Sequence, residues 1–216
     1  MSKTVIISGG TINEGFAEKI LAEYEGASVI GVDKGVEYLY RHQIIPQYIV
    51  GDFDSIDPEI IDYYRNETHV SIREYNPIKD ATDTEIAIRL GITLGSSEIL
   101  ILGATGGRVD HLWANVQTLV IACNAGVKAY ILDEKNKISV IDKPCVLKKS
   151  EAYGPFLSVF SLTGEIFDFS IRGTKWPLMH HMLRPCDSLT VSNRFEEEQV
   201  EIDFSSGMLV VMETRD

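Results

Sequence analysis

The sequence predicts an α/β domain with a mostly parallel sheet, followed by a smaller all-β domain built as an antiparallel sandwich or barrel. As far as about residue 130, short β-branched runs alternate with amphipathic helical segments. This alternation is typical of a parallel sheet whose two faces are covered by helices. From about residue 137, short runs follow one another with almost no helical periodicity, which indicates antiparallel strands. The 216 residues suffice for two domains, and the boundary is expected between 1–136 and 137–216.

The expected strands of the first domain are short and largely apolar. They are residues 4–8, 28–32, 48–50, 99–102 and 128–132. The expected helices alternate with them. Residues 13–24 place apolar side chains at spacings of three and four on one face, and a second helix is expected at 36–42.

Capping residues locate the remaining helices of the first domain. Asp57 provides an N-cap and Pro58 a proline at the first helical position, so a helix is expected to begin there. The segment Thr82-Asp83-Thr84-Glu85 is a capping box, and its helix is expected to stop at Gly95. A last helix is expected at 110–125, with one apolar stripe and Gly126 after its end.

The second domain is expected to consist of short strands separated by turn residues. These strands are 138–141, 156–162, 166–171, 188–191, 200–204 and 208–212. His180 and His181 are adjacent in the same region. Because neighbouring side chains of a strand face opposite ways, these two histidines are not expected to form a metal pair.

The composition excludes several classes of function. Lys and Arg number 20 against 32 Asp and Glu, which gives a net charge of −12. This balance argues against a nucleic-acid groove, because affinity there depends on basic side chains that neutralise phosphates. No run approaches the roughly 18 apolar residues of a membrane span. The three cysteines have neither disulfide nor metal-ligand spacing, so we expect a protein of the reducing cytoplasm.

Two acidic motifs are expected at the carboxyl ends of the parallel strands, where open α/β sheets bind ligands. Gly51-Asp52-Phe53-Asp54-Ser55 ends a strand; in an extended conformation both carboxylates point the same way and Phe53 points into the core. Lys79-Asp80-Ala81-Thr82-Asp83 precedes a helix. Helix caps and turns explain either motif alone. Carboxylates gathered without a cation, however, repel one another by about 1 to 4 kcal/mol per close pair. We therefore expect Asp52, Asp54, Asp80 and Asp83 to hold Mg²⁺, which bridges carboxylates and substrate phosphates.

Three further segments at this edge are candidates for nucleotide binding. Ser8-Gly9-Gly10 lets backbone amides approach a phosphate, although a plain tight turn explains it equally well. In Asp33-Lys34-Gly35, the acid can bind a ribose hydroxyl or a metal, or cap a helix. The segment Gly103-Ala104-Thr105-Gly106-Gly107-Arg108-Val109-Asp110-His111 precedes a helix whose N-terminus favours an anion. A capping turn explains Gly106 and Asp110 but leaves Arg108 and His111 without a reason.

With these motifs the chain resembles the thiamine pyrophosphokinase (thiamine diphosphokinase) family over nearly its whole length, from about residue 8 to 212. The Gly51–Ser55 motif is the most specific part of the resemblance, followed by the Lys79–Asp83 motif and the loop that ends in Asp110-His111. In the second domain the family pattern reads Gly173-Thr174-Lys175-Trp176-Pro177-Leu178, and later Ser192-Asn193 and Gly207. The order of the motifs also agrees.

The resemblance implies a Mg²⁺-dependent transfer of the pyrophosphoryl group of ATP to the hydroxyl of thiamine, with AMP released. The first domain would bind nucleotide and magnesium, and the second would bind thiamine and form a homodimer with the active site at the subunit interface. The residues implied for catalysis and metal binding are Asp52, Asp54, Asp80 and Asp83. Those implied for ATP binding are Gly9, Gly10, Asp33, Lys34, Gly35, Lys79, Thr82, Thr105, Gly106, Gly107, Arg108, Asp110 and His111. Those implied for thiamine binding are Ser192 and Asn193.

One feature of the family is missing, and two other readings of the motifs remain open. Some relatives stack a last-strand tryptophan on thiamine, but residues 208–211 contain none. Trp176 occupies the family's aromatic position, and ordinary packing explains it as well.

An Asp-rich strand edge would also serve a phosphohydrolase or another phosphotransferase, which would need no thiamine. A nucleotide- or thiamine-binding sensor would bind ligand without turnover, but the paired aspartates disfavour it.

Overall fold

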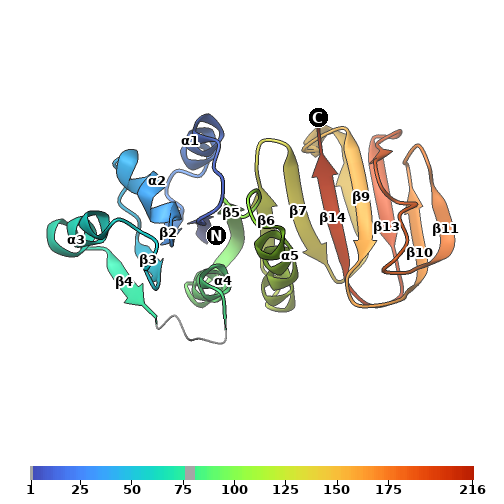
Figure 1. Cartoon of the computed structure of the whole chain (residues 1–216). Helices are drawn as coiled ribbons and strands as arrows, with labels where there is room; N and C mark the ends of the chain where they lie inside the picture. The colour runs from blue at the N-terminus through green and yellow to red at the C-terminus, as the bar shows by residue number, and fades with distance from the viewer. Residues whose placement is uncertain (1, 76–80) are drawn as a thin grey trace. The chain divides into compact units, whose positions relative to one another are not determined.

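A computed structural model describes residues 2–75 and 81–216 of the chain. The contacts between residues divide it into two units, Met1–Glu134 and Lys135–Asp216 (Figure 1). The predicted residues Lys79 and Asp80 lie outside the described residues.

The first unit is a doubly wound α/β fold. Its strands are β1 (Ser2–Ile7), β2 (Ser28–Val32), β3 (Tyr48–Gly51), β4 (Ser71–Glu74), β5 (Ser96–Leu102) and β6 (Lys128–Leu132). Its helices are α1 (Glu14–Glu23), α2 (Gly35–Arg41), α3 (Pro58–Glu67), α4 (Asp83–Thr93) and α5 (Val109–Asn124). The strands pair in the order β4-β3-β2-β1-β5-β6, and every pair is parallel.

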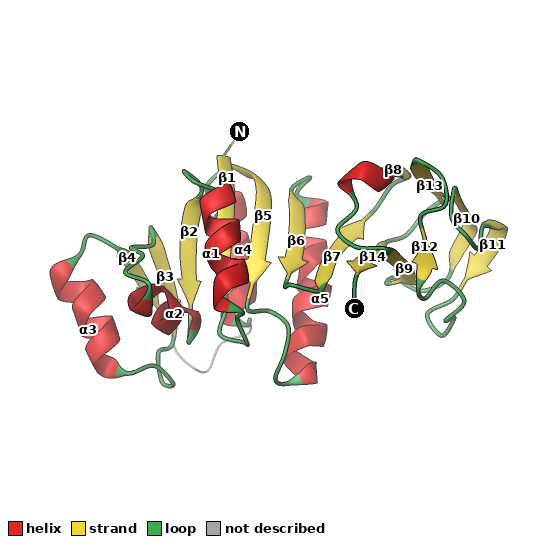
Figure 2. Cartoon of the chain, turned by 90° about the horizontal axis from the view of Figure 1, so that it is seen from above, coloured by secondary structure: helices red, strands yellow, loops and turns green. Residues whose placement is uncertain are grey.

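The strand order creates a switch point beside β1. From β1 the chain builds outward through β2, β3 and β4, and then continues on the other side of β1 with β5 and β6. In β1, Val5 pairs with Val29 on one side and with Leu100 on the other, and Val5, Ile6 and Ile7 are fully buried. Helices cover both faces of the sheet, with α1 and α4 on opposite faces (Figure 2). Ligands of doubly wound sheets bind at such a switch point, outside the carboxyl ends of the strands.

The second unit consists of two antiparallel sheets around one core. Its elements are β7 (Asn136–Ile141), β8 (Cys145–Lys148), the 3₁₀ turn η1 (Lys149–Glu151), β9 (Phe156–Ser161), β10 (Ile166–Arg172), β11 (Leu178–Leu183), β12 (Asn193–Arg194), β13 (Gln199–Asp203) and β14 (Leu209–Thr214). One sheet has the order β12-β9-β14-β7 and the other β11-β10-β13-β8. Buried side chains from both sheets, such as Leu157 and Val211 from the first and Phe169 and Ile202 from the second, form a single cluster. This arrangement is an antiparallel sandwich.

The structure confirms the predicted fold class, an α/β unit followed by an antiparallel β unit. It adds four strands that were not predicted, β4, β8, β11 and β12. β4 reads Ser-Ile-Arg-Glu and lies at the edge of its sheet, where a polar strand gives no apolar run to detect.

The predicted strand at 188–191 is wrong. Val191 N donates to Ser188 O, so these residues form a turn, and the side chains of Leu189 and Val191 are exposed. Thr190 is the buried member of the turn, with its hydroxyl donating to Val159 O of β9. In the sequence, the polar Thr190 lies between the apolar Leu189 and Val191. Polar and apolar residues therefore alternate here as they do in a strand, although no strand forms.

Candidate functional site

The loops that follow β1 and β5 are joined at the switch point. Ser8 N donates to Leu102 O at 2.8 Å, and Gly10 N donates to Gly103 O at 2.8 Å. A Cβ on Gly10 would lie 2.5 Å from Gly103 O, so only glycine allows this approach. The predicted loops Ser8–Gly10 and Gly103–His111 are therefore neighbours in space.

The side chains of Thr11 and Asn115 support the Gly103–His111 loop. Gly106 packs against Thr11, whose Oγ1 would lie 3.0 Å from a Cβ at that position. The buried Asn115 of α5 donates through Nδ2 to Ala104 O at 3.0 Å. Thr105 is half-buried, whereas Gly106 and Gly107 are exposed. The amides of this loop are thus held next to the N-terminus of α5, where an anion is stabilised.

The ends of β2 and β3 bring the Asp33 carboxyl close to Gly51. Asp33 follows β2, and a Cβ on Gly51 at the end of β3 would lie 2.5 Å from Asp33 Oδ1. The Asp33 carboxyl therefore lies over the end of β3, beside the chain that continues into Asp52. Gly9 packs on the same segment, with a Cβ at that position 3.2 Å from Lys34 N. Gly35 is buried against Ile7 O, which gives it a packing role.

The expected extended conformation of the Gly51–Ser55 motif is wrong. Phe53 has a φ of 60°, in the left-handed region that side chains rarely adopt. Asp54 N donates to Asp52 Oδ1 at 3.4 Å, which closes a short turn. Phe53 still packs against the cluster around Val36 and Ile49, as expected. In this turn Asp52 is half-buried and Asp54 is exposed, so the two carboxylates have different surroundings.

The first turn of α4 reaches the same edge. Thr82 is its N-cap and accepts from Glu85 N at 3.2 Å, as the capping box predicts. Asp83 is only 9% exposed. The hydroxyls of Thr84 and Ser8 share a buried hydrogen bond of 2.5 Å, which ties the start of α4 to the end of β1. Sequence reasoning missed the role of Thr84, because its partner is 76 residues away.

The predicted cluster of four carboxylates is not present among the residues that the structure describes. No three Asp, Glu, His or Cys side chains within residues 2–75 and 81–216 come close enough to hold a metal. Asp54 is exposed, and Asp80 is not among these residues. The donor set still fits magnesium, because this ion usually takes one or two protein carboxylates and completes its shell with substrate phosphates and waters. The described carboxylates near this edge include Asp33, Asp52, Asp54 and Asp83.

Arg108 and Asp110 form an exposed ion pair at the start of α5. Arg108 Nη2 lies 2.5 Å from Asp110 Oδ2, and Arg108 Nε donates to Oδ1 at 3.1 Å. The hydrogen bond from Arg108 holds the pKa of the Asp110 carboxyl below its usual value, and the same bond raises the pKa of Arg108. Asp110 Oδ1 also accepts from His111 N at 2.9 Å, and His111 is exposed. The pair places the Arg108 guanidinium beside the Asp110 carboxylate at the N-terminus of α5.

The predicted thiamine residues of the second unit differ sharply in accessibility. Ser192 is exposed and has a φ of 57°. Asn193 is 2% exposed, and its amide is bonded to the loop Gly173–Trp176. Trp176 is 52% exposed in that loop, and the Lys175 ammonium lies 4.9 Å from its ring centroid.

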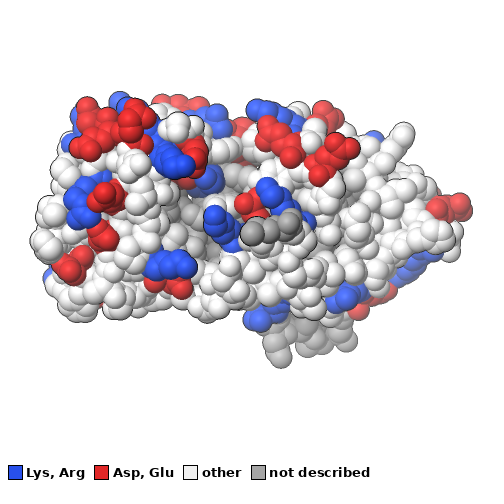
Figure 3. All heavy atoms as spheres, turned by 180° about the vertical axis from the view of Figure 1, so that it is seen from behind, with Lys and Arg blue, Asp and Glu red and all other residues white. Residues whose placement is uncertain are grey.

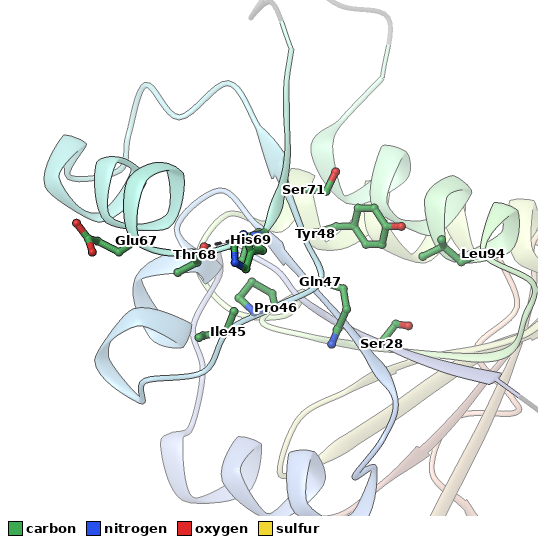
Figure 4. A pocket seen from close by; sticks show the side chains of 11 residues that line it. Ser28, Ile45, Pro46, Gln47, Tyr48, Glu67, Thr68, His69, Ser71 and Leu94 are labelled. Atoms are coloured by element: carbon green, nitrogen blue, oxygen red, sulfur yellow. Dashed lines mark hydrogen bonds between the residues drawn. The ribbon is translucent and has the colours of Figure 1, made fainter.

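A separate hollow of about 700 Å³ lies at the opposite edge of the parallel sheet (Figure 4). Ser28, Tyr48 and Ser71, the first residues of β2, β3 and β4, line it together with Gln47 and His69. Because strand beginnings and strand ends lie at opposite edges, this hollow is not part of the candidate site.

The acidic excess of the chain is distributed over the surface. On the face shown in Figure 3, acidic and basic side chains are interspersed. Several charged side chains of the described residues are paired, for example Lys3 with Glu98 at 3.0 Å and Arg172 with Glu201 at 2.8 Å. Among the described residues, no helix has the length and apolar character needed to cross a membrane.

Comparison with known proteins gives the same family for both units. Residues 23–131 match the family model for the thiamin pyrophosphokinase catalytic domain, and residues 145–209 match the model for the thiamin pyrophosphokinase vitamin B1 binding domain. The chain is 28% identical over 188 residues to the thiamine pyrophosphokinase of Bacillus subtilis, covering 87% of each. It is 28% identical over 185 residues to thiamine pyrophosphokinase 1 of Oryza sativa, covering 81% of this chain and 69% of the relative.

Solved structures extend this match to the whole fold. A crystal structure of the Bacillus subtilis thiamine pyrophosphokinase superimposes with a TM-score of 0.87 at 26% identity, covering 100% of both chains. The thiamin pyrophosphokinase of Geobacillus thermodenitrificans gives a TM-score of 0.84 at 26% identity, covering 100% of this chain and 98% of the other. Because the catalytic-domain model alone matches half of the sequence and the second model matches most of the β unit, the chain belongs to the thiamine pyrophosphokinase family.

Proposed function

We propose that this thiamine diphosphokinase transfers the pyrophosphoryl group of ATP to the hydroxyl of thiamine, releasing AMP, and that the transfer depends on Mg²⁺. The observation that carries the proposal is the meeting of the β1, β2, β3 and β5 loops and the start of α4 at one switch point. Glycine-rich backbone, carboxylates and an arginine are combined there, which is the set that phosphoryl transfer needs for positioning and charge neutralisation.

In this proposal the nucleotide lies over the Gly9-Gly10 and Gly106-Gly107 loops. Backbone amides at the start of α5 and the Arg108 guanidinium hold phosphate oxygens, and Asp33 is close enough to the β1 loop to bind the ribose or the metal. Asp52 and Asp83 hold Mg²⁺, with Asp54 and Asp80 as further ligands. The ion neutralises charge on the triphosphate when bound. A carboxylate of this group accepts the proton of the attacking hydroxyl.

Thiamine is proposed to bind to the second unit. The exposed Ser192 hydroxyl is available to a ligand, and the exposed face of Trp176 suits an aromatic cation such as the thiazolium ring. The Lys175 ammonium lies 4.9 Å from the centroid of the same ring, a cation–π distance that supports this proposal. Trp176 thereby provides the aromatic surface that residues 208–211 lack.

The reaction is tested by incubating the protein with Mg-ATP and measuring AMP. We expect AMP release only when thiamine is added, with thiamine diphosphate formed in equal amount. A phosphohydrolase would release a nucleotide product without an acceptor. AMP formation that is independent of thiamine would contradict the proposal.

Replacing Arg108 by Ala is expected to raise KM for ATP by about 10- to 100-fold, because a charge-assisted contact to phosphate contributes about 1.5 to 3 kcal/mol. The fold should not change, since the Arg108 side chain is 74% exposed. Arg89 provides the control: it is an exposed arginine of α4 that pairs with Glu85 at 2.9 Å. Steady-state kinetics with ATP as the varied substrate should show no effect of Arg89→Ala. An unchanged KM in Arg108→Ala would remove Arg108 from the ATP site.

The oligomeric state and the cellular location are also proposals. A homodimer with the active site at the subunit interface is supported by the exposed apolar side chains of the second unit, among them Val146, Phe167 and Met179. Sedimentation measurements should give twice the 24.1 kDa mass of the chain. A cytoplasmic location is supported by the three cysteines, Cys123, Cys145 and Cys186, none of which is in a disulfide.

A further inference from the structure

We infer that Asn193 is a positioning residue: its amide fixes the loop that presents Trp176, and it does not itself touch thiamine. The inference rests on the proposed thiamine site of the second unit. It assigns different roles to the two adjacent residues Ser192 and Asn193, which the resemblance alone places together at thiamine.

The hydrogen bonds of Asn193 leave it no capacity for a ligand. Its Nδ2 donates to Thr174 Oγ1 at 3.1 Å and to Trp176 O at 2.8 Å. Its Oδ1 accepts from Trp176 N at 3.0 Å and from Arg194 N at 2.9 Å. A side-chain amide has two donor hydrogens and two acceptor lone pairs, so all four are used. The side chain is also 2% exposed.

These bonds join two different sheets of the sandwich. Asn193 lies in β12, where it pairs with Leu157 of β9. The loop that it holds connects β10 to β11 in the other sheet. The backbone N–H and C=O of Trp176 both form hydrogen bonds with the side-chain amide of Asn193. This amide therefore fixes the position of the Trp176 backbone, while the Trp176 indole stays exposed.

Other bonds hold the start of the loop independently of the Asn193 side chain. Gly173 O accepts from Glu196 N and from Glu197 N, both at 3.0 Å, and Lys175 N donates to Arg194 O at 3.0 Å. Removal of the amide should therefore free Trp176 without unfolding the loop. Ser192 behaves differently: its backbone N donates to Ser158 Oγ at 2.9 Å, and its side chain is exposed.

The test uses Trp176 as its own reporter. The chain has two tryptophans, Trp113 and Trp176, and Trp113→Phe leaves Trp176 as the single indole. In this background we compare Asn193→Asp, which keeps both acceptors and loses the donors, with Thr174→Val, which removes one partner hydroxyl. Thr174→Ser, which keeps that hydroxyl, is the matched control. Thr174→Val serves as the milder variant should Asn193→Asp fail to fold.

Two measurements are made on each variant. Acrylamide quenching of Trp176 fluorescence without any ligand reports the position of the indole. Steady-state kinetics report KM for thiamine, KM for ATP and kcat. We expect Asn193→Asp to change the quenching and to raise KM for thiamine by about 10- to 100-fold, as displacement of a binding group by about 1 Å can do. KM for ATP should stay unchanged. Thr174→Val should change both readouts in the same direction, and Thr174→Ser should match the background.

Two results would overturn the inference. A raised KM for thiamine with unaltered Trp176 quenching would mean that Asn193 contacts thiamine directly. Altered quenching with an unchanged KM would mean that the position of Trp176 is irrelevant to thiamine. If the proposed function itself is wrong, the unmodified protein will release no AMP when thiamine is added. This result is distinct from the two results above.

Discussion

Replacing Asp52 by Asn should lower kcat for thiamine diphosphate formation by about 10³-fold, the loss typical of removing one preorganised electrostatic group from a transition state. Asp52 follows β3, and its half-buried carboxyl stands at the edge where Asp33 covers the end of the same strand. Asn has the same shape and can still accept from Asp54 N, so the turn should persist. The substitution therefore removes charge rather than structure.

Asp62→Asn is the control for this experiment. Asp62 lies on α3 with its side chain 65% exposed and lies 4.0 Å from Arg65, and such surface pairs contribute little. Both variants are assayed over a range of Mg²⁺ concentrations, with Asp54→Asn as a parallel arm. A rate near that of the unmodified protein for Asp52→Asn at saturating Mg²⁺ would exclude Asp52 as metal ligand or base. A loss in Asp54→Asn as well would place the exposed carboxyl in the site.

The features that were predictable from sequence are those with a local cause. The N-caps Asp57 and Thr82 accept the hydrogen bonds that their spacing predicts. The strand at Lys128–Leu132 has the expected bounds, because its apolar run is bounded by turn residues. The parallel sheet follows from the alternation of such strands with helices, and its carboxyl edge follows from the topology.

The features that escaped prediction depend on contacts between distant segments. The Ser8–Thr84 hydrogen bond joins residues 76 positions apart, and the approach of Asp33 to Gly51 arises only when β2 and β3 pair. Asn193 looks like a ligand residue in the sequence, yet its partners Thr174 and Trp176 lie in the loop between two strands of the other sheet. No local pattern encodes these pairs.

Backbone strain was equally hidden, and part of it lies at the candidate site, whereas Gln43, Asp168 and His180 have positive φ elsewhere. Asp33 and Phe53, which lie just beyond β2 and β3, both have φ in the left-handed region, at 45° and 60°. Ser192 has the same feature at 57° in the second unit. Non-glycine residues adopt this region at a cost of about 1 to 3 kcal/mol and are frequent at functional sites. Asp33 and Ser192 are themselves predicted to bind ligands, and Phe53 lies between the predicted metal ligands Asp52 and Asp54.

Gly35→Ala should destabilise the protein by about 3 kcal/mol, because it overpacks a site that cannot relax. A Cβ on Gly35 would lie 2.0 Å from Ile7 O and 2.9 Å from Ser8 O. Ile7 is held in β1 between Gly31 and Leu102, so its carbonyl cannot retreat, and α2 must move instead. Movement of α2 would shift Lys34, on which Gly9 packs, so KM for ATP should rise together with the loss of stability.

Gly15→Ala separates this steric effect from the general effect of adding a methyl group. Gly15 is exposed in α1, and its nearest neighbour to a new Cβ is Asn13 Oδ1 at 3.9 Å. Alanine favours a helix over glycine by about 0.5 to 1 kcal/mol, so this variant should be slightly more stable. Urea unfolding of the two variants should therefore shift in opposite directions. Equal stability of Gly35→Ala and Gly15→Ala would mean that α2 does not rest on the end of β1, and the Gly9 loop would then lack the support on which the proposed ATP site depends.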